Sequence, residues 1–183
     1  MKLVFVHNSK TAGVSIVETL EHLPEFYNYG HRPLKLLSTR IATEDVITFT
    51  VVRNPFSRVW SQYNYYRTKR DAIAERVSFE EFVLTYESYY TLHDNAFRTC
   101  FEMISIDGEV AIDYLLKFET LIEDWKEFSN KFNLPTTLQV VNTSAKPSID
   151  KKTLYTPEMR THIENIFKKD FQEFEYSYKS FIN

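Results

Sequence analysis

The sequence predicts an α/β fold in which helices flank a central parallel sheet, giving three layers. Short runs rich in β-branched residues alternate with amphipathic helix patterns, and the first run ends in a tight polar turn that leads straight into a helix. The chain contains only three glycines, which argues against a sandwich or barrel built from many tight turns. With 183 residues, it is predicted to form one domain over residues 1–183.

The composition narrows the classes of function. Hydrophobic residues make up 43% of the chain and charged residues 26%, as in ordinary globular proteins. The net charge of -3 gives no support for nucleic-acid binding. A single cysteine, Cys100, excludes an internal disulfide and fits a reducing compartment. The first strand begins almost at Met1 and no apolar run reaches transmembrane length, so we expect a cytoplasmic protein without a membrane partner.

The first predicted strand, turn and helix form a candidate anion site. A β-branched and aromatic run ends near Val6, the turn carries Lys10 and Gly13, and an apolar helix face follows at Ile16, Val17, Leu20 and Leu23. Such a unit directs backbone N–H groups and the positive end of a helix dipole at one spot, which favours phosphate or sulfate. Because Lys10 precedes the only glycine of the turn, the segment is P-loop-like but lacks an evident magnesium-binding Ser/Thr.

A second anion site is predicted at the end of the strand over residues 46–52. Asn54 is a suitable N-cap and Pro55 a suitable first helical residue, so Arg53 lies where the strand ends and a helix begins. Ser61 lies about two turns into that helix. Parallel sheets bind ligands at the carboxyl ends of their strands. We therefore expect the turns after residues 7 and 53 to lie side by side.

The later segments continue the alternation of strands and helices. We expect a helix that opens at the capping box Ser78–Glu81, a strand over residues 111–118, and a helix over residues 121–132 that ends at Asn133-Leu134-Pro135. A polar segment with lysines covers residues 142–152. A terminal helix then opens at Thr156-Pro157-Glu158 and turns inward the apolar residues Met159, Ile163, Ile166, Phe167 and Phe171.

The two candidate anion sites resemble those of sulfotransferases that use 3'-phosphoadenosine 5'-phosphosulfate (PAPS). Residues 10–15 are similar to the loop Pro-Lys-Thr-Ala-Gly-Thr-Ser of the carbohydrate (heparan/chondroitin-type) branch, with Ser9 in place of the proline and Val14 in place of the second threonine. Arg53 and Ser61 match the family's 3'-phosphate motif, Arg-Asn-Pro-(aromatic)-x-Arg-x-x-Ser, without a gap. Residues 115–121 and the carboxyl-terminal end are also similar, so the resemblance covers nearly the whole chain.

The resemblance implies transfer of a sulfuryl group from PAPS to an acceptor hydroxyl, with adenosine 3',5'-bisphosphate as product and no metal. The branch that it resembles implies a carbohydrate acceptor, and a small metabolite or a tyrosine side chain stays open as an acceptor. The resemblance also implies that Lys10 neutralises charge at the bridging oxygen and that His31, which follows Gly30, is the base, for which an ordinary imidazole pKa near 6.5 is suited. The residues expected to bind PAPS are Lys10, Thr11, Ala12, Gly13, Val14, Ser15, Arg53, Ser61 and Lys146.

Less specific interpretations of these residues stay open. Lys10 also fits a solvated turn lysine, Arg53 a strand-end arginine paired with a carboxylate, and Lys146 a solvated basic loop. His7, at the end of the first strand, is either a rival base or a buried hydrogen-bonding residue. Arg58 is expected to be an exposed helix arginine. The tyrosines at positions 63, 65, 66, 86, 89 and 90 fit an acceptor wall or, with more weight, helix packing.

Two other functions also stay open. A small P-loop kinase would use ATP with magnesium, although its Gly-Lys-Ser/Thr loop is missing from this sequence. A nucleotide-binding module that has lost catalysis is the other alternative, and the departures at Ser9 and Val14 are the only hints of it.

Overall fold

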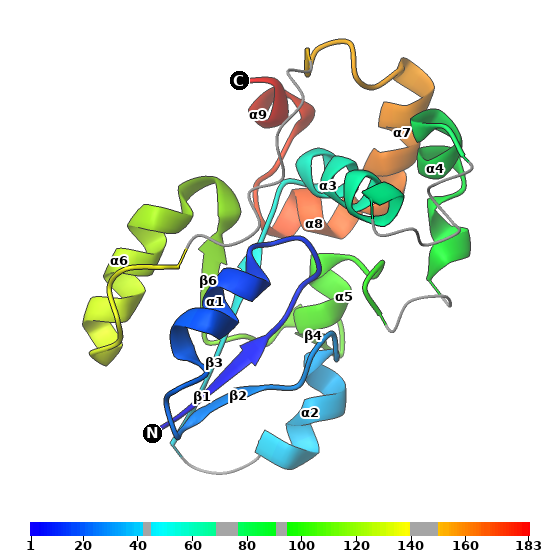
Figure 1. The fold of residues 1–183 in the computed structure, drawn as a ribbon. Helices are drawn as coiled ribbons and strands as arrows, with labels where there is room; N and C mark the ends of the chain where they lie inside the picture. The colour runs from blue at the N-terminus through cyan, green and yellow to red at the C-terminus, as the bar shows by residue number, and fades with distance from the viewer. Residues whose placement is uncertain (42–44, 69–76, 91–94, 140–149) are drawn as a thin grey trace. The chain divides into compact units, whose positions relative to one another are not determined.

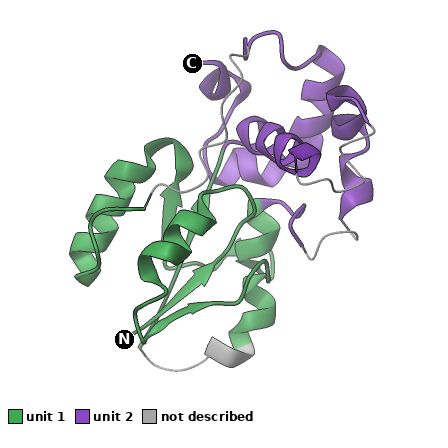
Figure 2. Ribbon diagram, viewed as in Figure 1, with its two compact units in different colours: residues 1–53, 100–144 green, residues 54–99, 145–183 purple. Residues whose placement is uncertain are grey.

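The computed structural model describes residues 1–41, 45–68, 77–90, 95–139 and 150–183, and Figure 1 shows its ribbon. The chain divides into two compact units, which Figure 2 distinguishes by colour. Unit 1 comprises residues 1–53 and 100–144, and unit 2 comprises residues 54–99 and 145–183. Each unit therefore combines two separate stretches of the chain. That residues 1–183 form one domain remains a prediction.

Unit 1 contains a parallel four-stranded sheet with the strand order β2-β1-β3-β6. The strands are β1 (Lys2–Val6), β2 (Phe26–Asn28), β3 (Val46–Val52) and β6 (Tyr114–Lys117). The register of β1 on β3 runs from Lys2↔Val46 to Val6↔Thr50, and that of β3 on β6 ends at Val52↔Lys117. The predicted parallel sheet is confirmed. Strand β2 was not expected, because three residues are too few to show a period of two.

Helices complete unit 1 on both faces of the sheet. They are α1 (Gly13–Leu20), α2 (Leu34–Ile41), α5 (Cys100–Ile104) and α6 (Leu121–Phe132), with a short 3-10 turn over Phe118–Thr120. In Figure 1, α1 and α6 lie on the opposite side of the sheet from α2 and α5. A two-stranded antiparallel sheet, β4 (Ser105–Ile106) with β5 (Glu109–Val110), follows α5.

The alternation of side chains along the strands explains why both faces of the sheet are covered. Phe5, Phe49 and Leu116 pack with residues of α1 and α6 in one buried apolar cluster. Their neighbours along the strands, Val6 and Val52, point to the other face and are also fully buried. A parallel sheet that is apolar on both faces needs helices on both, and this requirement produces the three layers.

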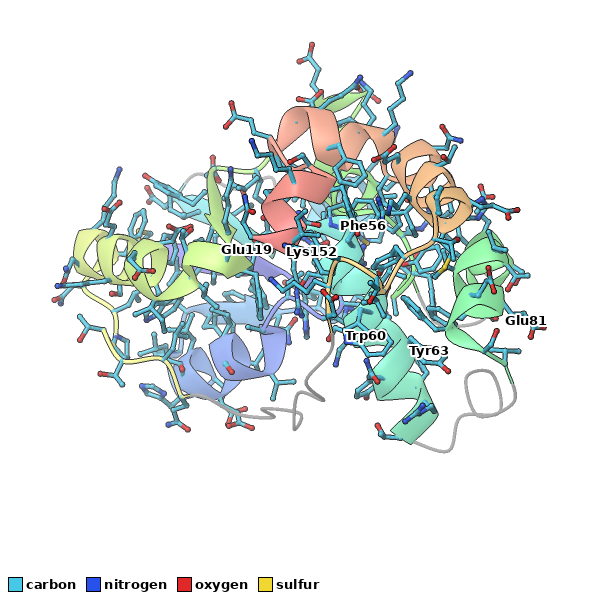
Figure 3. The ribbon with its side chains drawn as sticks, turned by 90° about the horizontal axis from the view of Figure 1, so that it is seen from above. Phe56, Trp60, Tyr63, Glu81, Glu119 and Lys152 are labelled. Carbon is cyan, nitrogen blue, oxygen red and sulfur yellow. The ribbon has the colours of Figure 1, made fainter. Side chains whose placement is uncertain are left out.

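Unit 2 is helical and its core is aromatic. Its helices are α3 (Pro55–Thr68), α4 (Phe79–Leu84), a 3-10 helix (Tyr86–Tyr89), α7 (Pro157–Ile166), α8 (Lys168–Glu173) and α9 (Tyr178–Ile182). Figure 3 shows Phe56, Trp60 and Tyr63 following one another along α3. The Trp60 and Phe79 rings meet edge to face at 4.8 Å, and Tyr63 lies 5.2 Å from Phe79. Such aromatic pairs each add stability beyond the area that they bury.

Most of the tyrosines that could have formed an acceptor wall belong to this core. Tyr63, Tyr66, Tyr86 and Tyr89 are all buried in it, whereas Tyr65 is 40% exposed. The hydroxyl of Tyr86 donates to the side-chain oxygen of a buried glutamine, Gln62, at 2.7 Å. Helix packing is therefore the role that the structure supports for the four buried rings.

Two features of unit 2 differ from the expectations. Arg58 is fully buried rather than exposed, and its Nη2 donates to the carbonyl oxygens of Ala96 at 3.3 Å and Arg98 at 2.7 Å. The predicted terminal helix is divided into α7 and α8 at Phe167, whose φ of -97° and ψ of 21° leave the helical region. The apolar period continues across the break because Phe167 is itself buried in the core.

None of the helices in the described ranges combines the length and the apolar character that a membrane crossing would need.

Asn54 fixes the start of α3. Its side-chain oxygen accepts the Phe56 N–H at 3.1 Å, which is a capping contact, and Pro55 is the first helical residue as predicted. Its amide nitrogen donates to the Ser177 carbonyl at 3.0 Å and to the Ser180 hydroxyl at 3.1 Å, at the beginning of α9. One buried side chain therefore joins two helix starts within unit 2.

We expect Asn54→Ala to lower the free energy of unfolding by about 2 kcal/mol, because it removes a helix cap and the amide donor that bonds to the start of α9. Urea denaturation monitored by circular dichroism measures this loss. Asn54→Ser is the matched control, since its hydroxyl can cap α3 but cannot replace the amide donor, and its loss should be intermediate. Wild-type stability in Asn54→Ser would show that the bonds to α9 contribute nothing.

Candidate active site

The predicted anion loop lies between β1 and α1, at the carboxyl end of the sheet. We call residues 7–12 the Lys10 loop. Lys10 and Ala12 both adopt left-handed backbone conformations, with φ of 64° and 67°. Residues with a Cβ enter this region at a cost of about 1 kcal/mol or more each. The surrounding contacts must therefore hold the loop in this shape.

Asn8 and Thr11 supply two of these contacts. The Thr11 hydroxyl donates to the Asn8 carbonyl at 2.9 Å, which closes the loop on itself. The Asn8 amide donates to the Thr50 hydroxyl and to the Val51 carbonyl, both at 3.0 Å, and Thr50 in turn donates to the Val6 carbonyl at 2.7 Å. The start of the loop is thereby tied to the neighbouring strand β3.

Helix α1 begins directly after the loop. Ala12 is its N-cap residue and Gly13 its first residue, and the Ile16 N–H donates to the Ala12 carbonyl at 3.2 Å. The N–H groups of Gly13, Val14 and Ser15 precede that bond, in the first turn of the helix, where N–H groups point out of the helix end. Together with the helix dipole they form an environment that favours an anion. The side chain of Val14 is 43% exposed beside them.

Gly13 leaves room for a histidine ring. A Cβ built at this position would collide with the imidazole of His7, above all with its Nε2. His7 also stacks on Phe5 of β1, with the two rings 5.2 Å apart, so the imidazole has little freedom to give way. The requirement for glycine is therefore steric and is imposed by the side chain of His7.

Arg53 brings the second predicted motif to the Lys10 loop. Its Nη1 donates to the Lys10 carbonyl at 2.9 Å, which confirms that the turns after residues 7 and 53 lie side by side. Its guanidinium carbon also lies 3.9 Å from the centre of the Phe118 ring, at the end of β6. Arg53 is thus held by two neighbouring segments of unit 1.

Two other residues expected to bind PAPS, Ser61 and Lys146, are placed less completely. Ser61 lies on α3, where it is half-buried, and it belongs to unit 2, whereas Arg53 is the last residue of the first stretch of unit 1. Lys146 lies outside the described residues. The roles expected for Ser61 and Lys146 remain predictions.

His31, the predicted base, lies against the start of the Lys10 loop. Its Nδ1 is 2.8 Å from the His7 carbonyl oxygen, and the two imidazole rings are 4.4 Å apart. A carbonyl oxygen can only accept, so Nδ1 must carry the proton. In the neutral ring, Nε2 is then the basic nitrogen. The loop and the candidate base are thereby joined through one peptide group.

His7 is poorly suited to be the base. Burial, together with the smaller effect of the neighbouring His31, lowers the pKa of His7 from 6.5 to about 3. The ring therefore stays neutral near pH 7 and is a weak proton acceptor. Its contacts with Gly13 and Phe5 instead favour a packing role for the partly buried ring, in place of the predicted alternative of a buried hydrogen-bonding residue.

Three residues that shape this site were not singled out for a binding role: Asn8, His7 as the neighbour of Gly13, and Phe118. A polar residue directly after a buried strand is a usable signal for Asn8. No sequence signal indicates the contact of His7 with Gly13, because a turn separates the two residues. The contact of Phe118 with Arg53 gives no signal either, because the two residues are distant in the chain.

A strand–loop–helix unit beside an arginine from the end of a second strand is an α/β arrangement that favours an anionic ligand at the carboxyl edge of the sheet. The family model described as the sulfotransferase family matches residues 4–177. The chain therefore belongs to the sulfotransferase family, which comprises PAPS-dependent transferases, and it is an enzyme of this kind.

A solved structure supports the same fold. The crystal structure of a sulfotransferase from Alicyclobacillus acidocaldarius is similar with a TM-score of 0.53 and 14% sequence identity, over 100% of this chain and 96% of that one. At this identity the similarity concerns the fold alone. No curated protein matches the chain.

We expect Gly13→Ala to lower the free energy of unfolding by about 2 kcal/mol, since overpacking a tight site costs more than the gain in helix propensity. In a His7→Ala background the same change should cost much less, because the colliding ring is gone. Urea denaturation of the four proteins in this double-mutant cycle measures the coupling. Val14→Ala is the control, because it changes the next residue of α1, whose exposed side chain does not face His7 in the same way as a Cβ at Gly13. An equal penalty in both backgrounds would show that His7 does not impose the glycine.

The low pKa of His7 predicts a dependence of stability on pH. The unfolded chain takes up a proton near pH 6.5, whereas folded His7 does so only near pH 3. Stability from the neutral ring is thus complete above pH 6.5 and is lost as the pH falls, by up to about 1.4 kcal/mol per pH unit. Unfolding free energies measured between pH 7.5 and pH 5 should fall less steeply in His7→Gln. Identical slopes for the two proteins would contradict this.

Proposed function

We propose that this enzyme transfers a sulfuryl group from PAPS to an acceptor hydroxyl on a carbohydrate and releases adenosine 3',5'-bisphosphate. The observation that carries the proposal is the 2.9 Å hydrogen bond from Arg53 to the Lys10 carbonyl, because it joins the two anion motifs at one edge of the sheet. The carbohydrate acceptor rests on the likeness of residues 10–15 to that branch of the family. The cytoplasmic location stays a prediction.

The Lys10 loop fits a phosphosulfate group. Backbone N–H groups from Thr11 to Ser15 span the left-handed Ala12 and the start of α1, directly after the left-handed Lys10, an arrangement that suits tetrahedral anions. Gly13 lets the start of the helix pack against the His7 ring. Lys10, which is partly exposed, adds the positive charge. PAPS itself supplies an activated sulfuryl group on a phosphate that leaves as an anion.

Lys10 is assigned to the developing negative charge. When the bond between sulfur and the bridging oxygen breaks, charge grows on that oxygen, and a cation next to it lowers the barrier. In this assignment the N–H groups of Gly13 and Val14 share the charge, so no metal ion is required. Ala12 and Ser15 complete the loop through their backbone.

Arg53, Ser61 and Lys146 are assigned to the nucleotide. Arg53 would hold the 3'-phosphate through charge-assisted hydrogen bonds, with the Ser61 hydroxyl as a second donor and Lys146 closing over the ligand. Arg53 has the strongest structural support of the three, because it already contacts the Lys10 loop. Ser61 rests on the sequence motif, and Lys146 rests on its place in the polar, lysine-containing segment over residues 142–152.

His31 is assigned as the base. Its Nδ1–H donates to the His7 carbonyl, so its Nε2 can take the proton from the acceptor hydroxyl as the new bond between oxygen and sulfur forms. Fixing the tautomer through a backbone carbonyl also fixes the plane of the ring. The weakly basic His7 would not compete for that proton.

Calorimetry separates this function from its rivals. We expect adenosine 3',5'-bisphosphate to bind without magnesium and more tightly than ATP with magnesium, and the reverse order would favour a kinase. Transfer of label from [35S]PAPS to a panel of oligosaccharides then tests the acceptor. Tight binding without transfer to any hydroxyl acceptor would indicate a module that has lost catalysis.

We further expect Lys10→Ala to lower kcat by about 100-fold, as removal of one charge-stabilising group at a reacting oxygen typically does. The thermal midpoint should change little, because the side chain is partly exposed. Lys35→Ala is the matched control, since Lys35 is an exposed lysine of unit 1 that pairs with Asp107 at 3.0 Å on the surface. Turnover of Lys10→Ala at the level of Lys35→Ala would remove the proposed role.

A further inference from the structure

Phe118 contacts the arginine of the proposed 3'-phosphate site. The guanidinium carbon of Arg53 lies 3.9 Å from the centre of the Phe118 ring. This is the separation of two groups in van der Waals contact, and it lies well within the 6 Å over which a cation is attracted to an aromatic face. A planar guanidinium is the cation best able to stack in this way.

The sheet register produces this contact. Val52 of β3 is paired with Lys117 of β6, so the next residue on each strand, Arg53 and Phe118, leaves the sheet at the same level. The Lys117 N–H donates to the Asp124 carboxylate at 2.7 Å, in the first turn of α6, which fixes the end of β6. The position of the ring therefore follows from the fold and does not depend on a ligand.

The Phe118 ring is itself held in place by packing within unit 1. Phe118 packs against the buried apolar cluster of unit 1 that includes Leu121 and Trp125 of α6. Arg53 is in turn held at Nη1 by the Lys10 carbonyl. A guanidinium that is fixed at one edge by a hydrogen bond and on one face by a ring has lost most of its rotational freedom before any phosphate arrives.

We infer that Phe118 is a positioning residue that orients the Arg53 guanidinium for the 3'-phosphate of the nucleotide. This inference rests on the proposed function, in which Arg53 binds that phosphate. The ring reduces the ordering cost that Arg53 would otherwise meet on binding, so affinity rises without a contact between Phe118 and the ligand. The effect is specific to ligands that carry a 3'-phosphate.

A purely structural role makes a different prediction. If Phe118 served only the core, its loss would weaken binding of every nucleotide to the same extent or lower stability alone. The ratio of two affinities therefore separates the alternatives. Adenosine 3',5'-bisphosphate and adenosine 5'-phosphate differ by the 3'-phosphate alone, so their affinity ratio reports on Arg53.

Isothermal titration of both nucleotides into wild type, Phe118→Leu and Phe118→Tyr tests the inference. Leucine keeps an apolar side chain without a π face, and tyrosine restores the ring. Phe132→Leu is the matched control, because Phe132 packs against the same cluster at the other end of α6. Phe118→Met serves as the second non-aromatic variant if Phe118→Leu does not fold, as judged by circular dichroism.

We expect the affinity ratio of Phe118→Leu to fall about five-fold, the size of a moderate cation–π contribution, while Phe118→Tyr and Phe132→Leu keep the wild-type ratio. An unchanged ratio in the non-aromatic variants, or an equal fall in Phe118→Tyr, would overturn the role of Phe118. A wild-type protein that does not prefer the bisphosphate would instead refute the proposed 3'-phosphate site itself, so the two failures are distinguishable.

Discussion

The parallel pairing of β1 with β3 is the constraint on which the candidate site depends. It brings the ends of two strands that are more than forty residues apart in the chain to the same edge, from Lys2↔Val46 to Val6↔Thr50. Asn8 then bonds across this pair to Thr50 and Val51, and Arg53 bonds back to the Lys10 carbonyl. The loop can keep two unfavourable left-handed residues because these bonds, together with the Thr11 hydroxyl, leave it no lower-energy arrangement nearby.

Uncharged residues hold the charged and polar groups of the candidate site in position at this edge of the sheet. His7 is held neutral by burial, fills the space that Gly13 leaves open, and offers its carbonyl to His31. Phe118 supports Arg53 in a similar way from the next strand. Arg53 and the loop that carries Lys10 are thus supported by residues whose contribution is shape and orientation. Such preorganisation is what allows fixed charges and dipoles to stabilise a reacting anion.

Unit 2 is organised on a different principle. Stacked and edge-to-face aromatic rings supply most of its core, and a buried arginine, Arg58, bonds to backbone carbonyls inside it. The residues of the motif that begins at Arg53 therefore have two different roles. Asn54 and Pro55 start α3 and Arg58 ties it to backbone carbonyls of unit 2, whereas Arg53 contacts the Lys10 loop and is proposed to bind the nucleotide. A motif can retain residues for the helix that it opens as well as for the ligand that it binds.

The sequence alone determined the elements that rest on local patterns. The strand over residues 46–52, the helix over residues 121–132 and the start of α3 at Pro55 follow from β-branched runs, apolar periodicity and turn residues, and the order of two phosphate motifs indicated the family. Tertiary structure alone decided the contacts of His7, His31 and Phe118, and the burial of Arg58. These depend on which segments distant in the chain become neighbours, and no local propensity encodes that.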